Sequence, residues 1–189
     1  MESLARNTFI AFMMLSALMT VSTAQQDSSK TYRLSLPGKN WSLEVPLSEF
    51  SDISQQTETY VRELKAGRGM NKKQSPVVLN IRMEPAKIPG DAQALRDSVK
   101  EKLRKNRSVA QESLKLSLHD EIPLMRYSFD ASQVFSPQTS DFPKMKVLEA
   151  YYVKDEIWIT VRMNFFAFKK EDESFFLSFV DSLKFLDKP

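Results

Sequence analysis

The one histidine of the chain, His119, is the residue most suited to acid-base chemistry, and it stands in the run Ser117-Leu118-His119-Asp120-Glu121. Serine, histidine and aspartate are the residue types of a hydrolytic triad, in which the histidine activates the serine. The members of a triad meet through the fold and are rarely sequence neighbours, and no nucleophile-elbow glycine motif accompanies His119. We therefore interpret His119 as an exposed turn histidine and predict no catalytic residue.

Metal ligands are scarce in this sequence. Cysteine is absent, which excludes thiol chemistry and thiolate metal sites. The acidic clusters lack the spacing of a calcium loop and fit turns or a helix start. These clusters are Asp120-Glu121, Asp155-Glu156 and Glu171-Asp172-Glu173. The sequence thus predicts no metal and no cofactor, although any two acids could still face each other across a cleft, as in glycoside hydrolysis.

Two other patterns have a functional and a structural interpretation. Gly67-Arg68-Gly69 lacks the Gly-Lys-Ser/Thr ending of a phosphate-binding loop, so a nucleotide site is not expected. Large aromatic residues could line a ligand groove, but on sheets they usually belong to the core. The aromatic residues concerned are Trp41, Tyr151, Tyr152, Trp158 and Phe166.

Charge is unevenly distributed along the chain. The whole sequence has a formal net charge of +3, whereas residues 62–107 contain 13 bases and 5 acids. Such a segment either contacts an anionic partner or forms an ordinary solvated face. The candidate contacts are Arg68, Lys72, Lys73, Lys100, Arg104 and Arg107. The partner would be an anionic envelope component or a protein, and no nucleic acid is expected.

The N-terminal residues predict export. A weakly positive start precedes the apolar block 9–19, and small residues Ser22 and Ala24 follow it, as in a cleavable signal peptide. The block is too short for a comfortable membrane span, so no transmembrane segment is expected after cleavage. We therefore predict a signal peptide over residues 1–24, a polar stub over 25–31, and a single domain over 32–189 in the periplasm or outside the cell. The missing cysteine fits a bacterial periplasm or cell exterior.

Alternation of apolar and polar residues predicts strands that would position these side chains. Residues 32–36 and 41–45 form an expected hairpin that ends at Pro46. Residues 60–64 could be a short strand, and 67–76 have the composition of an exposed, mobile loop. A half-buried strand is expected over 77–84. Further strands are expected at 112–117, 124–131, 144–154 and 157–168, with Asp155-Glu156 as a tight turn between the last two.

Two helices are expected. Asp91 is a good N-cap for a helix with an apolar stripe up to about Asn106, and its bases suit the negative end of the helix dipole. A closing helix begins near Glu171 and carries an apolar stripe that contains Phe176 and Phe179. Hairpins rather than crossovers predict an α+β fold, an antiparallel β-sheet with helices packed against it.

This order of elements resembles the PsbP/DcrB-like α-β sandwich, a group of exported or thylakoid-lumen domains. The segments that carry the resemblance are 34–43, 77–106, 151–166 and 176–185. The chain lacks the acylated cysteine of the lipoprotein members, and no metal-binding residue of the family maps onto it. The resemblance implies an accessory or binding domain rather than an enzyme. Two function classes therefore remain, a non-catalytic exported binding domain and, as the alternative, a small exported hydrolase that uses carboxylates.

Overall fold

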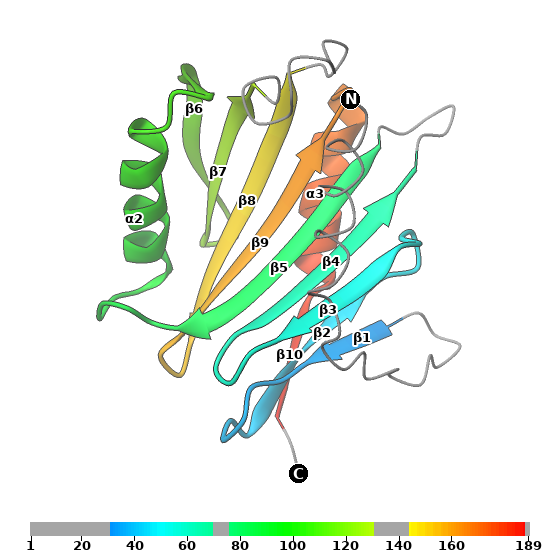
Figure 1. Ribbon diagram of the computed structural model, residues 1–189, viewed down its shortest axis with the longest axis vertical. Coiled ribbons are helices and arrows are strands. Elements are labelled where there is room, and N and C mark those ends of the chain that lie inside the picture. Colours follow the sequence, from blue (N-terminus) through cyan, green and yellow to red (C-terminus); the bar gives the residue numbers. More distant parts are fainter. Residues whose placement is uncertain (1–30, 70–75, 131–143, 188–189) are drawn as a thin grey trace, which may run out of the picture.

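The computed structural model describes residues 31–69, 76–130 and 144–187, which form two antiparallel sheets and two helices (Figure 1). The predicted signal peptide, Lys72 and Lys73 lie outside these residues. The elements are β1 (Thr31–Leu34), β2 (Trp41–Pro46), β3 (Ile53–Thr57), β4 (Arg62–Arg68), β5 (Val77–Pro85), α2 (Ala92–Arg104), β6 (Val109–His119), β7 (Ile122–Phe129), β8 (Met145–Lys154), β9 (Ile157–Phe165), α3 (Lys170–Ser182) and β10 (Lys184–Asp187).

The larger sheet has the strand order β3-β4-β5-β9-β8-β7-β6, and every neighbouring pair in it is antiparallel. The β8–β9 hairpin confirms the predicted tight turn, because Lys154 pairs with Ile157 across Asp155-Glu156. Strand β9 lies between β5 and β8 at the centre of the sheet. Its residues are buried or half-buried on both faces, so both faces are covered at least in part, as expected.

One face of the large sheet packs against α3 and the small sheet, whose strand order is β1-β2-β10. The predicted alternation of β5 is confirmed, since Val77, Leu79, Ile81 and Met83 are all buried in this core. Phe176 and Phe179 of α3 lie in the same core, so the apolar stripe of that helix packs on the sheet as predicted.

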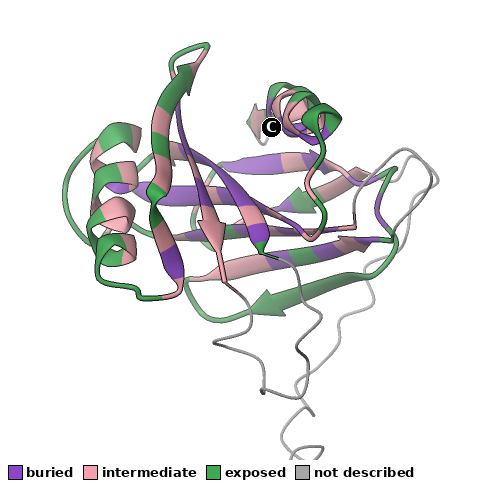
Figure 2. Ribbon diagram, turned by 90° about the horizontal axis from the view of Figure 1, so that it is seen from above, coloured by how far each residue is buried: buried purple, intermediate pink, exposed green. Residues whose placement is uncertain are grey.

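The other face carries α2, which contacts β6, β7 and β8. Figure 1 shows this helix beside the β6 end of the large sheet. The side chain of Asp91 accepts a hydrogen bond of 2.9 Å from the backbone N–H of Ala94, which confirms it as the N-cap. Leu95 is the buried anchor of this helix, in a core that includes Tyr151 and Trp158. In Figure 2 the buried residues lie mainly along the strands, and both helices carry exposed residues on their outer sides.

The α+β class is thus confirmed at the level of antiparallel sheets with helices packed against them. Two strands were not predicted: β3, whose residues are all exposed and mostly polar, and β10, which follows α3 directly and pairs with β2. Among the described residues, no helix is long and apolar enough to cross a membrane.

Candidate functional site

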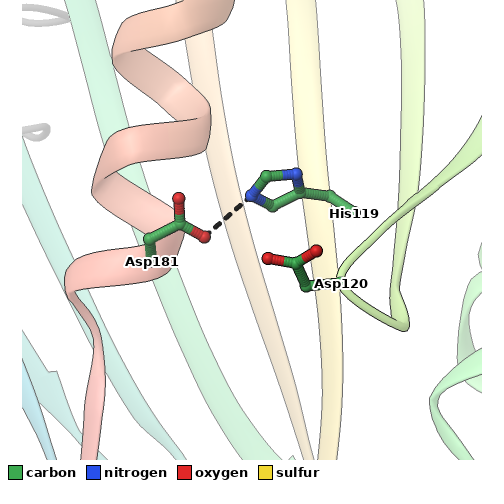
Figure 3. A group of neighbouring side chains, drawn as sticks. All are labelled: His119, Asp120 and Asp181. Carbon is green, nitrogen blue, oxygen red and sulfur yellow. Dashed lines mark hydrogen bonds and ion pairs between the residues drawn. The ribbon is translucent and has the colours of Figure 1, made fainter.

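The side chains of His119, Asp120 and Asp181 lie close together beside the turn between β6 and β7 (Figure 3). Each of them could bind a metal ion or transfer a proton. Nε2 of His119 lies 2.7 Å from Oδ1 of Asp181, and one ligand atom from each of His119, Asp120 and Asp181 lies within 4.8 Å of the others. The His119 side chain is 25% exposed and that of Asp181 51% exposed. The interpretation of His119 as an exposed turn histidine is therefore wrong, because it ends strand β6 half-buried and paired with an acid.

The local structure explains why these three side chains lie close together. Strands β6 and β7 are joined by Asp120 and Glu121, which have φ values of 46° and 69° and so form a tight left-handed turn. His119 and Asp120 therefore lie at the tip of a hairpin. Asp181 comes from the last turn of α3, a helix far away in sequence that packs over the same face of the sheet.

Asp181 was missed by sequence analysis, although its position carries a signal. The last turn of α3 contains no basic residue, so this carboxylate stands at the negative end of the helix dipole without a cation from its own helix. An acid in that unfavourable place indicates a partner from elsewhere in the fold. The sequence could not show that the partner is His119, 62 positions away.

A cleft of about 320 Å³ opens beside this cluster. Asp120 and Glu121 form part of its rim, and Lys154 contributes a cation. Its walls are mainly apolar and aromatic, and are formed by Ala92, Ile122, Pro123, Tyr151, Tyr152, Val153 and Phe185. Of the aromatic residues proposed for a groove, Tyr151 and Tyr152 line this cleft, whereas Trp41 and Trp158 are buried in the two cores.

Tyr152 is the lining residue of the cleft whose hydroxyl has no partner within the described part of the chain. Its ring packs against Phe185 with the centroids 5.8 Å apart, and its oxygen is buried without a hydrogen-bond partner among the described residues. Burial, and then the negative charge of Asp181, raise the pKa of Tyr152 above its ordinary value. Tyr152 therefore keeps its proton at neutral pH, and its hydroxyl is a buried donor that no described residue uses.

Glu149, an acid outside this cluster, is fully buried in β8 on the α2 side of the large sheet. Its carboxylate accepts hydrogen bonds from the hydroxyls of Tyr127 and Tyr151 and from Nε of Arg162. Burial, followed by the charge of Glu149, raises the pKa of both tyrosines. A carboxylate held by three donors has a structural role, and we do not assign it to the candidate site.

Of the six proposed anion contacts, the structure describes four, and it places Arg68 away from the three that belong to α2 or follow it. Arg68 is buried at the end of β4, where it pairs with Glu49 at 3.2 Å and Asp172 at 3.9 Å and stacks over Phe175. The prediction of an exposed loop is wrong at Gly67 and Arg68, because both belong to strand β4. Arg68 contacts α3, whereas Lys100, Arg104 and Arg107 lie in or just after α2 on the opposite face.

Comparisons with models of protein families and with curated proteins found no match to this sequence.

Proposed function

We propose that the chain is an exported, non-catalytic binding domain and that its binding site is the cleft beside the β6–β7 turn. The observation that carries the proposal is the lining of this cleft. Half-buried aromatic rings, Tyr152 and Phe185, form an open apolar wall, while Lys154 and the acids of the turn provide a few polar groups at the edge. This composition is typical of a site that takes an apolar or aromatic body and orients it by its polar ends.

Several contacts favour binding over the alternative, a carboxylate hydrolase. Glu149 already accepts from three donors, and the Asp120 and Asp181 carboxylates are exposed rather than desolvated. Within the described residues, His119 has no hydrogen-bonded hydroxyl that it could activate as a nucleophile. The resemblance to PsbP/DcrB-like domains points the same way, toward an accessory role outside the cytoplasm.

A matched pair of variants on α2 tests the cleft. Ala92 lines the cleft and the neighbouring Gln93 is exposed, so Ala92→Trp fills the cleft while Gln93→Trp adds the same ring outside it. NMR spectra of the labelled protein would be recorded with small aromatic compounds and with envelope extracts. We expect shifts around Tyr152 and Phe185 that Ala92→Trp abolishes and Gln93→Trp leaves unchanged.

Two results would contradict the proposal. One is binding that persists unaltered in a folded Ala92→Trp variant. The other is hydrolysis of an ester, peptide or glycoside substrate that His119→Ala abolishes without changing the thermal midpoint, which would favour the hydrolase. Export itself is tested separately, by N-terminal sequencing of the secreted protein, where we expect Gln25 as the first residue.

A second contact surface fits the same binding role. Lys102, Arg104, Lys105 and Arg107 are exposed at the end of α2, and Lys100 is half-buried beside them. We propose that this basic end of α2 attracts an anionic envelope component or protein, without the participation of Arg68.

A further inference from the structure

We propose that His119, Asp120 and Asp181 form a binding site for a divalent first-row transition metal ion such as Zn²⁺. The inference goes beyond the proposed function, because a metal ion can bind there whether or not the cleft holds a ligand. It rests on two observations: the type and spacing of the ligand atoms, and the position of Asp181 on its helix.

The three side chains offer donor atoms of the types that the metal binds, at distances near those of a coordination sphere. An imidazole nitrogen with two carboxylate oxygens is a common donor set for zinc, and three protein ligands leave a fourth position for water. Tetrahedral coordination at about 2.0–2.2 Å places ligand atoms about 3.4 Å apart. Here the His119–Asp181 pair is 2.7 Å apart and all three ligand atoms lie within 4.8 Å of one another. Each of these distances therefore needs to change by no more than about 1.4 Å.

The ligands come from rigid parts of the fold. His119 is held in the β6–β7 ladder opposite Ile122, and Asp120 is fixed by the tight turn. Asp181 lies in an α-helix whose neighbours Phe179 and Val180 are buried in the core. Figure 3 shows the carboxylate of Asp120 beneath the His119–Asp181 pair, with all three side chains turned toward one another. Little chain entropy would therefore be lost on binding.

Electrostatics favour a cation at this point. Asp181 is an anion at the negative end of α3, where no base in the last turn compensates it, and Asp120 adds a second negative charge. The negative charge of Asp181 acts on the buried Tyr152 hydroxyl, which has no hydrogen-bond partner among the described residues.

The preference for a transition metal over calcium or magnesium follows from the donors. Calcium takes six to eight oxygen ligands and magnesium keeps an oxygen octahedron, whereas an imidazole nitrogen suits zinc and its neighbours. The β8–β9 turn serves as a comparison for the β6–β7 turn. Asp155-Glu156 repeats the Asp-Glu turn with the same left-handed backbone, at φ values of 49° and 61°, but belongs to no such cluster with a histidine among the described residues.

The test uses the protein produced without a polyhistidine tag and titrated with ZnCl₂ by calorimetry, while NMR follows the imidazole nitrogens of the single histidine. We expect one saturable Zn²⁺ site and a shift of the His119 Nε2 signal. His119→Ala, Asp181→Asn and Asp120→Asn should each weaken the affinity about tenfold or more. Asp155→Asn, in the matched turn, should leave the affinity unchanged.

These variants change partly or fully exposed side chains, and circular dichroism would confirm that each one folds. The proposal is overturned if Zn²⁺ does not bind at millimolar concentration, if the imidazole signals do not move, or if His119→Ala binds as tightly as Asp155→Asn. Tighter binding of Ca²⁺ or Mg²⁺ than of Zn²⁺ would also overturn it.

Discussion

Glu149 and Arg162 are register partners across strands β8 and β9, and Nε of the arginine donates to the buried carboxylate. The glutamate is fully buried, whereas the arginine side chain is 40% exposed. The carboxylate of this pair therefore lies in the core beneath α2, while the arginine side chain extends from it toward solvent.

Arg162 and Glu149 should be energetically coupled, so that the effects of removing each charge do not add. Arg162→Met leaves a buried carboxylate without its cation, and we expect the free energy of unfolding to fall by about 2–3 kcal/mol, less than for a fully buried pair because water reaches the arginine. The double variant Arg162→Met, Glu149→Gln should lose less than the sum of the single variants. Urea unfolding of all four proteins measures this coupling, and strict additivity would contradict it.

The two tyrosines that donate to Glu149 predict a loss of stability at alkaline pH. The pKa of Tyr127 and that of Tyr151 are raised above 10.0, mainly by burial and then by the charge of Glu149. Above about pH 10 the unfolded chain releases these protons while the folded protein retains them. Because the unfolded state then binds fewer protons, the free energy of unfolding should fall as pH rises, and these groups should have no effect below that range.

The matched comparison is the variant Tyr127→Phe, Tyr151→Phe. Lysine titration affects both proteins, so only the difference between their slopes of unfolding free energy against pH reports on the two tyrosines. We expect a shallower slope in the variant between about pH 9 and 11. Parallel slopes would show that these hydroxyls do not retain their protons in the folded protein.

Arg68 should be important for stability rather than for binding. It is 6% exposed and pairs with Asp172, which is 3% exposed and also accepts from the backbone N–H of Lys169 at the start of α3. Arg68→Ala should cost about 3 kcal/mol, because it leaves a buried acid without this cation. The control is Arg104→Ala on the surface of α2, which should change stability by less than about 0.5 kcal/mol. Equal midpoints in urea would contradict this assignment.

The basic end of α2 should attract anionic surfaces in a salt-dependent manner. Changing Lys100, Arg104 and Arg107 to Glu should weaken binding to anionic vesicles at low salt, and the difference should shrink at about 0.1 M salt, where screening acts over about 10 Å. A co-sedimentation assay measures it, with Arg33→Glu as a single-charge control on the small sheet. Unchanged, salt-insensitive binding would leave this end of the helix as an ordinary solvated surface.

Much of the fold was predictable because its elements carry local signals. The alternation of β5 and the Asp91 cap each depend on neighbouring residues, and both are confirmed. Strand β3 lacks such a signal, since an exposed strand of polar residues has no buried face to reveal it. Arg68 was misinterpreted because the composition around it is that of a loop, whereas its burial depends on contacts with Glu49 and Asp172.

The candidate site depends on contacts that are distant in sequence. His119 and Asp120 were recognised as chemically capable, but Asp181 reaches them only through the packing of α3 on the large sheet. The position of Glu149 was in principle readable, because it interrupts the apolar face of β8 that contains Val147 and Tyr151. Tyr151 lies two residues further along β8, but Tyr127 and Arg162 come from the neighbouring strands β7 and β9, and their contacts with Glu149 require the register of the sheet.

The two Asp-Glu turns bear on the order in which the hairpins fold. A left-handed backbone costs an L-residue about 1–2 kcal/mol, less for aspartate, and a glutamate occupies that conformation in both turns. Residues that disfavour the backbone conformation of their turn do not nucleate the hairpin around it. The β6–β7 and β8–β9 hairpins should therefore close only after their strands have begun to pack, so that substitutions in these turns change the unfolding rate more than the folding rate.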